Sequence, residues 1–194
     1  MTLKTRFFDA FASRPRPSGD EILRPSVRHD GDRLRELLAT RTSTQLSPYE
    51  LRSEVEGNLW MLSPKAFRYF LPAFLSAALE CYDTISVFAS ELVTALTKPD
   101  RADVEAALDR LSGASPRLRL PEETTRQLRE QQLDWFDSGT PSAIFHERVE
   151  DLSQDEGRAI LAFFDAFRER HGADFPFGEL DAAIDRYWNE YGPF

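Results

Sequence analysis

The chain has 194 residues and a formal net charge of −9, with 41% hydrophobic and 29% charged side chains. This composition is typical of a folded domain and argues against an intrinsically disordered chain. No stretch approaches the roughly 20 consecutive apolar residues that cross a bilayer, so we expect no membrane association. Asp9 interrupts the apolar run near the N-terminus, which argues against a signal peptide, and the single cysteine, Cys81, favours a reducing cytoplasm.

The negative charge is concentrated toward the C-terminus. Residues 121–194 carry 17 acidic and 7 basic side chains, whereas residues 1–29 carry 3 acidic and 6 basic ones. An acidic region repels a phosphate backbone, so we expect no nucleic-acid binding. The same charge is compatible with a basic protein partner, although charged residues also commonly serve only to solvate the outer faces of helices.

The N-terminal segment is predicted to form a short helix followed by a proline-rich linker or strap. Pro15 and Pro17 impose an extended path on residues 14–29. We therefore divide the chain into an N-terminal segment, 1–29, and a helical domain, 30–194. Apolar side chains line one side of the short helix or pin the strap to the domain, namely Phe7, Phe8, Phe11, Ile22, Leu23 and Val27.

Capping residues mark the helix starts in the middle of the chain. Ser47 and Glu50 form a capping box around Pro48, and a second Leu-Ser-Pro sequence begins another helix. Apolar residues at helical spacing predict a further helix over residues 82–98. The helix after it is expected to end at Gly113, and the following segment, ASPRLRLPEE, is expected to be short and extended.

The last third of the chain is also helical in pattern. A helix is predicted from Pro121 to about Phe136 and is broken at DSGTPS. Ser153 and Glu156 form a second capping box, which begins a helix that ends before Gly172, and one more helix follows. The pattern therefore predicts an all-α fold: a single compact helical domain of about seven or eight helices.

The segment at residues 62–79, LSPKAFRYFLPAFLSAAL, places a proline inside an aromatic helix. On a helical wheel, Pro72 and Tyr69 fall opposite the face that carries the phenylalanines. We therefore expect Pro72 to face outward and to bend the helix around the core. In the alternative interpretation, the Arg68 carbonyl that the proline leaves free takes part in recognition together with Tyr69.

This segment also carries a family resemblance. LSPKAFRYFLPAF resembles the central motif of a family of uncharacterised bacterial proteins classed as a domain of unknown function. PRPSGDEI resembles the N-terminal segment of that family, and LSQDEGRAILAFFDAF with DRYW resembles its C-terminal helices. The resemblance implies a small cytoplasmic bacterial protein and imports no catalytic residue. A looser resemblance links the chain to immunity and toxin-neutralising proteins. Residues 98–145 show no resemblance to the family.

The sequence contains no pattern that indicates catalysis. His146 begins H-E-x-x-E, which lacks the second histidine of a zinc-binding H-E-x-x-H, and His171 lies where a histidine commonly caps a helix C-terminus. No nucleophile elbow, phosphate-binding loop or dinucleotide-binding glycine motif is present. We therefore predict no catalytic residue, no metal site and no cofactor.

Two functions from different classes remain. The first is a non-enzymatic protein-binding module, immunity- or regulator-like, whose acidic C-terminal surface binds a basic partner. The second is a small-molecule-binding or enzymatic helical domain with an aromatic cleft. Its candidate binding residues are aromatic side chains with polar tips and one arginine: Trp60, Arg68, Tyr69 and Trp188. An open cleft would favour the second function and a broad acidic face the first.

Overall fold

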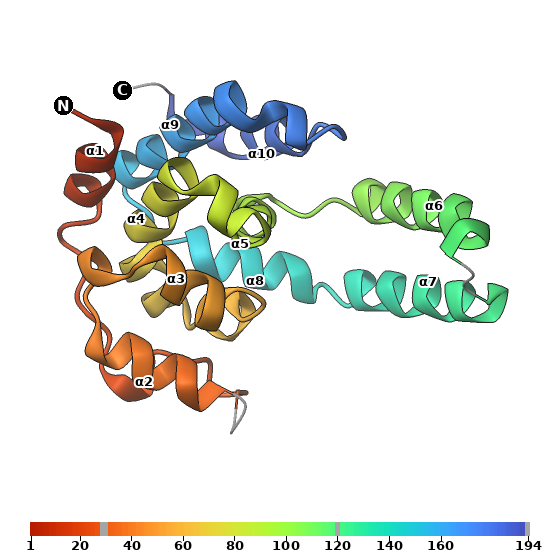
Figure 1. The fold of residues 1–194 in the computed structure, drawn as a ribbon, viewed down its shortest axis with the longest axis horizontal. Coiled ribbons are helices and arrows are strands. Elements are labelled where there is room, and N and C mark those ends of the chain that lie inside the picture. Colours follow the sequence, from red (N-terminus) through yellow and green to blue (C-terminus); the bar gives the residue numbers. More distant parts are fainter. Residues whose placement is uncertain (28–30, 119–120, 193–194) are drawn as a thin grey trace. The chain divides into compact units, whose positions relative to one another are not determined.

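The computed structural model describes residues 1–27, 31–118 and 121–192, and for residues 115–118 only the backbone. Within this part of the chain there are ten α-helices and no β-strand (Figure 1). The predicted all-α class is therefore confirmed. The number of helices exceeds the expected seven or eight, and α8, Thr140–Val149, was not predicted.

The helices belong to two compact units. Unit 1 consists of Met1–Thr97 and Arg148–Phe194, and unit 2 of Lys98–Glu147. The domain boundary that the sequence predicted at residues 29 and 30 lies outside the described residues. Unit 1 contains seven complete α-helices among its described residues: α1 (Leu3–Ala10), α2 (Asp32–Thr40), α3 (Pro48–Glu50), α4 (Pro64–Glu80), α5 (Tyr82–Leu96), α9 (Gln154–His171) and α10 (Glu179–Arg186).

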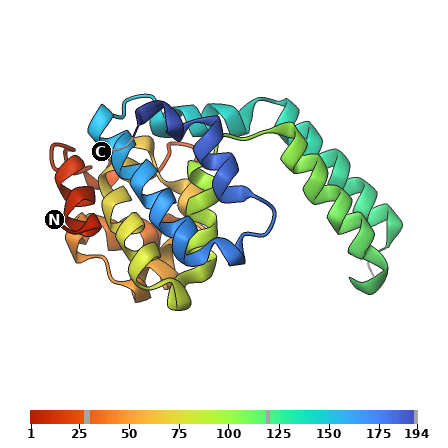
Figure 2. The ribbon, with the colours of Figure 1, turned by 90° about the horizontal axis from the view of Figure 1, so that it is seen from above.

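Helix α4 is the centre of unit 1 (Figure 2). It begins where the sequence predicted, because Ser63 accepts a hydrogen bond from the Ala66 amide and Pro64 occupies the first turn. Helices α1, α5 and α9 pack around it, together with the short turn at Ser43–Gln45. Most of its side chains are buried, as expected for a helix that is apolar on nearly all sides.

The prediction that Pro72 faces outward is wrong. Pro72 is buried inside the continuous helix α4, and Ser76, one turn later, is buried as well. Tyr69 is half-buried and its ring meets that of Phe70 edge to face, with 4.9 Å between the centroids. A helical wheel shows which residues share a face but not what covers it, and here neighbouring elements cover both faces of α4.

The N-terminal strap runs along the start of α4. Ile22 and Leu23 are buried, and the strap forms backbone hydrogen bonds from Arg24 N–H to Met61 O at 2.8 Å and from Ser63 N–H to Ile22 O at 2.9 Å. In addition, the Lys65 ammonium group lies 2.6 Å from the Glu21 carboxylate. The strap is thus held by both apolar burial and backbone pairing.

Helix α5 contains a break that is capped from outside the helix. Ile85 has non-helical dihedral angles of −130° and 33°, so the helix restarts after it. The Glu56 carboxylate accepts the Phe88 amide of the restarted helix at 3.1 Å. Glu56 follows α3 and the π-helical turn at Leu51–Val55, and it therefore serves as an N-cap supplied by another segment.

Unit 2 contains an antiparallel helical hairpin of α6, Arg101–Leu118, and α7, Glu122–Asp137 (Figures 1 and 2). The prediction that the first of these helices ends at Gly113 is wrong, because α6 continues for five more residues in place of the expected extended segment. Packing between the two helices outweighs the roughly 1 kcal/mol that a glycine costs inside a helix. Ion pairs from Arg101 to Asp137 and from Arg129 to Asp109 join them.

The C-terminal segment is held by a close approach to the start of α9. Trp188 is fully buried, stacks on Phe164 and donates its indole N–H to Leu96 O at 2.7 Å. Three residues later, the Tyr191 ring lies against Gly157, where an added Cβ would be 1.9 Å from the nearest ring carbon. Gly157 thus leaves the space that the aromatic ring occupies.

We predict that Gly157→Ala destabilises unit 1 by roughly 1–3 kcal/mol, because the tyrosine must move out of its packed position. Urea denaturation followed by circular dichroism measures this change. Gly172→Ala is the matched control, since that position is helical and an added Cβ would approach only the flexible Arg168 side chain, at 3.8 Å. A loss of stability in Gly172→Ala as large as that in Gly157→Ala would contradict the packing argument.

Candidate functional site

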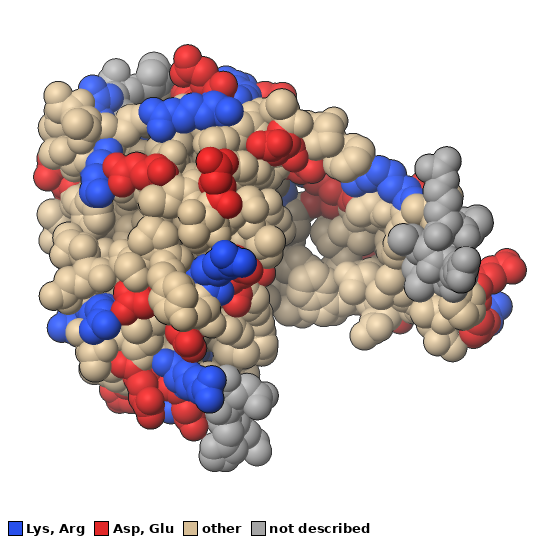
Figure 3. Space-filling view, in the orientation of Figure 1, with Lys and Arg blue, Asp and Glu red and all other residues tan. Residues whose placement is uncertain are grey.

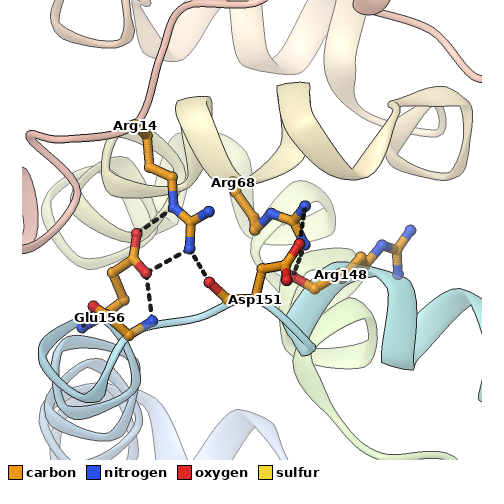
Figure 4. Close-up of polar contacts among 6 residues, drawn as sticks. Arg14, Arg68, Arg148, Asp151 and Glu156 are labelled. Atoms are coloured by element: carbon orange, nitrogen blue, oxygen red, sulfur yellow. Dashed lines mark hydrogen bonds and ion pairs between the residues drawn. The ribbon is translucent and has the colours of Figure 1, made fainter.

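A network of arginines and carboxylates, most of them buried or half-buried and one, Asp151, exposed, joins four segments of unit 1 (Figure 4). Its first part is the predicted capping box of α9. Ser153 accepts the Glu156 amide at 3.2 Å, and the Glu156 carboxylate accepts the Ser153 amide at 2.7 Å. The Glu156 side chain is only 2% exposed, so this carboxylate requires a counter-ion.

Arg14 of the strap is that counter-ion. It donates Nε–H and one terminal N–H to the two Glu156 oxygens, at 2.5 and 2.6 Å, and it also contacts the Asp151 carbonyl. The hydrogen bond to Glu156 raises the pKa of the Arg14 guanidinium. A bidentate pair of this kind fixes both direction and distance, and it therefore sets where the strap crosses the start of α9.

Arg68 and Arg148 form the second part of the network. Arg68 donates to the Asp151 carboxylate at 3.3 Å and to the Arg148 carbonyl at 3.4 Å. Burial lowers the pKa of the Arg68 guanidinium, and the positive charge of Arg14 lowers it further. The Arg148 guanidinium lies 4.9 Å from the centroid of the Phe67 ring and donates to the carbonyls of Ala95 and Leu59.

This network is suited to holding segments together. Each arginine contacts a carboxylate, a carbonyl oxygen or an aromatic ring of the chain itself. Arginine is well suited to this role because it stays charged when buried and its donors have a fixed planar arrangement. We therefore interpret the network as a clamp that joins the strap, α4, the end of α8 and the start of α9.

The four predicted binding residues occupy different environments. Trp188 is 0% exposed within the core, and Arg68 is 8% exposed with its guanidinium directed to Asp151. Tyr69 is half-buried against Phe70. Trp60 is 54% exposed. Trp188 cannot line an open cleft from its buried position, and of the four only Trp60 presents most of its side chain to solvent.

Trp60 belongs to a surface that the sequence reasoning did not identify. Its indole N–H donates to Gly57 O at 3.1 Å, and the Gly57 amide donates to both Glu91 oxygens at 2.8 Å. Val87, one helical turn before Glu91 on α5, is 58% exposed. With Glu56, these residues form what we call the tryptophan–glutamate surface. Trp60 was the only member of this surface that the sequence singled out, because Glu56 and Glu91 lie 35 residues apart in the chain.

The environment of Glu91 on this surface disfavours the ionised form of its carboxyl group. Burial raises the pKa of Glu91, and the neighbouring negative charge of Glu56 raises it as well, although the Gly57 hydrogen bond acts in the opposite direction. Each carboxylate accepts a backbone amide rather than pairing with a basic side chain in the interactions described above. The surface therefore carries a concentrated negative charge.

Neither a metal site nor a membrane span is found in the described part of the chain. No group of three or more histidine, cysteine, aspartate or glutamate side chains is placed to hold a metal ion among these residues. None of the helices they form has both the length and the apolar character that crossing a bilayer requires. Cys81 is half-buried at the junction of α4 and α5 and forms no disulfide.

Comparison with known proteins gave no match. Neither a protein-family model, nor a curated protein, nor a solved structure matches this chain. The resemblance to a bacterial family of unknown function therefore stays a prediction. Function must be argued from the residues of the chain itself.

We predict that Arg14→Ala lowers the free energy of unfolding of unit 1 by roughly 2–4 kcal/mol, because it leaves the buried Glu156 carboxylate without its counter-ion. Chemical denaturation measures the change. Arg16→Ala is the control, since Arg16 is exposed and donates only to the Ala39 carbonyl. The double variant R14A/E156Q should be less destabilised than Arg14→Ala, and an additive loss would contradict the counter-ion argument.

We predict that Glu91→Gln stabilises the protein at neutral pH. A carboxyl whose pKa is higher in the folded than in the unfolded state costs stability once it ionises. Glutamine removes that charge and can still accept the Gly57 amide. The gain should be present at pH 7 and vanish below about pH 4, where glutamate is protonated in both states. Urea denaturation across this pH range measures it, and a less stable variant at pH 7 would contradict the prediction.

Proposed function

We propose that this chain is a non-enzymatic protein-binding module that recognises a basic protein partner, immunity- or regulator-like in its role. The observation that carries the proposal is the charge of residues 148–194, which hold 11 acidic and 5 basic side chains. The N-terminal part of unit 1, residues 1–97, has 12 of each and is neutral. The whole net charge of unit 1, −6, therefore comes from its C-terminal part.

The acids of this C-terminal part lie almost entirely at the surface. Of the 11, only Glu156 is buried, and it is neutralised by Arg14. On α9 and α10, Arg168 pairs with Asp181 at 2.7 Å and with Asp165 at 3.2 Å, and the Asp185 charge also acts on it. One cation shared among three carboxylates leaves a net negative charge there. Such a field accelerates association with a positively charged protein.

The remainder of unit 1 has a mixed surface. On the face shown in Figure 3, which also includes parts of α9 and α10, acidic and basic side chains are interspersed among uncharged ones. Many of these charges form pairs, such as Lys4 with Glu80 at 2.9 Å and Arg41 with Glu50 at 2.8 Å. Exposed pairs of this kind contribute little to long-range attraction because their fields largely cancel. The long-range attraction of a partner is therefore governed by the unbalanced acids of residues 148–194.

We predict that the immobilised protein retains a basic protein from a lysate of its source organism at about 0.05 M salt and releases it at about 0.5 M. Mass spectrometry of the retained fraction identifies the partner. A variant with Glu169→Gln, Asp185→Asn and Glu190→Gln should retain less of it, while Glu122→Gln and Glu123→Gln on α7 should not change the retained amount. Retention of only acidic proteins, or of none at low salt, would contradict the proposal.

A further inference from the structure

The tryptophan–glutamate surface of unit 1 is built from two segments that meet at one carboxylate. Trp60 is tied to Gly57 through its indole, and Gly57 is tied to Glu91 through its amide. Val87 lies one turn before Glu91 on the same side of α5. Two exposed apolar side chains, Trp60 and Val87, thus belong to the same surface as the Glu91 carboxylate.

The second carboxylate, that of Glu56, is held nearby by the Phe88 amide of the same helix. The two segments that supply the carboxylates contain no basic residue of their own: α5 has no lysine or arginine, and neither does the segment at 53–62. From another element, the buried Arg148 guanidinium donates to the Leu59 carbonyl. The nearest basic residue in that part of the sequence is Arg52. An exposed indole beside two carboxylates is complementary to a guanidinium or ammonium group, which can stack on the ring and pair with the acids.

The surface is held in place from beneath. Arg148 donates to the carbonyl of Leu59, which precedes Trp60, and to that of Ala95, in the last turn of α5. The Trp60 indole is itself fixed by its hydrogen bond to Gly57. A tryptophan whose position is set before binding loses little conformational freedom on contact, and such residues contribute disproportionately to protein interfaces.

We propose that the tryptophan–glutamate surface docks a basic segment of the protein partner, with an arginine or lysine side chain on the Trp60 indole and against Glu56 and Glu91. This inference rests on the proposed function and assigns it a site. The negative charge of Glu56 and Glu91 favours a positively charged segment at this surface. A second copy of the chain fits poorly, since the same surface would bring carboxylates against carboxylates.

The test is a titration of the full chain with a peptide of alternating arginine and serine, followed by NMR of the tryptophan indole N–H groups. The chain has three tryptophans, so the spectrum has three such signals, assigned with Trp60→Phe and Trp135→Phe. We expect the Trp60 signal to shift on binding and the signal of the buried Trp188 to stay in place. The counterpart peptide with glutamate in place of arginine should cause no shift.

Variants locate the site. Trp60→Ala and Glu91→Gln should each weaken peptide binding about ten-fold, the loss expected for a partly desolvated cation on an aromatic ring. Val87→Ser should weaken it less. Glu80→Gln removes an exposed acid elsewhere on unit 1 and should leave the affinity within about two-fold. Urea denaturation of Glu91→Gln, as described above, shows whether this variant is folded, so that a weaker affinity can be assigned to the loss of the carboxylate.

The results of the titration distinguish a failure of the proposed site from a failure of the proposed function. If the wild-type chain binds the arginine peptide and Trp60→Ala and Glu91→Gln bind it equally well, the site is wrong and the proposed function stands. If the wild-type chain binds neither the arginine peptide nor any basic protein, both are wrong. Self-association of the chain that Trp60→Ala abolishes, without a peptide-induced shift of the Trp60 signal, would instead assign the surface to a second copy.

Discussion

The burial of α4 on nearly all sides is the constraint on which unit 1 depends. A helix whose aromatic and aliphatic residues leave no solvated face is stable only when other elements surround it. In this chain α1, α5 and α9 supply that cover, and the N-terminal strap closes the start of the helix through the pairing of Leu23 with Leu62. The positions of the remaining elements follow from this requirement.

The polar interactions fix how the covering elements join. Apolar packing is non-directional, so it does not by itself determine where an extended strap crosses a helix end. The bidentate pair between Arg14 and Glu156 supplies that direction, and Arg68 with Arg148 links α4 to the segment that precedes α9. Removing one member of such a pair is costly because the other is left charged in a buried position.

The tryptophan–glutamate surface contrasts with this clamp. In the clamp, burial of charge is compensated by a counter-ion from the same chain. At Glu91, burial and the proximity of Glu56 instead raise the pKa, so the ionised side chain costs stability at neutral pH. Groups retained at a cost to folding often act in binding, because the opposite charge of a partner offsets that cost.

Local sequence determined the all-α class and the capped helix starts, and tertiary structure decided which residues are exposed. The capping boxes at Ser47 and Ser153 and the Ser-Pro start of α4 were predictable because they depend on residues three apart. The burial of Pro72, the continuation of α6 past Gly113 and the approach of Glu91 to Gly57 were not. Each depends on packing or pairing with another element, and helical periodicity shows which residues share a face but not what covers it.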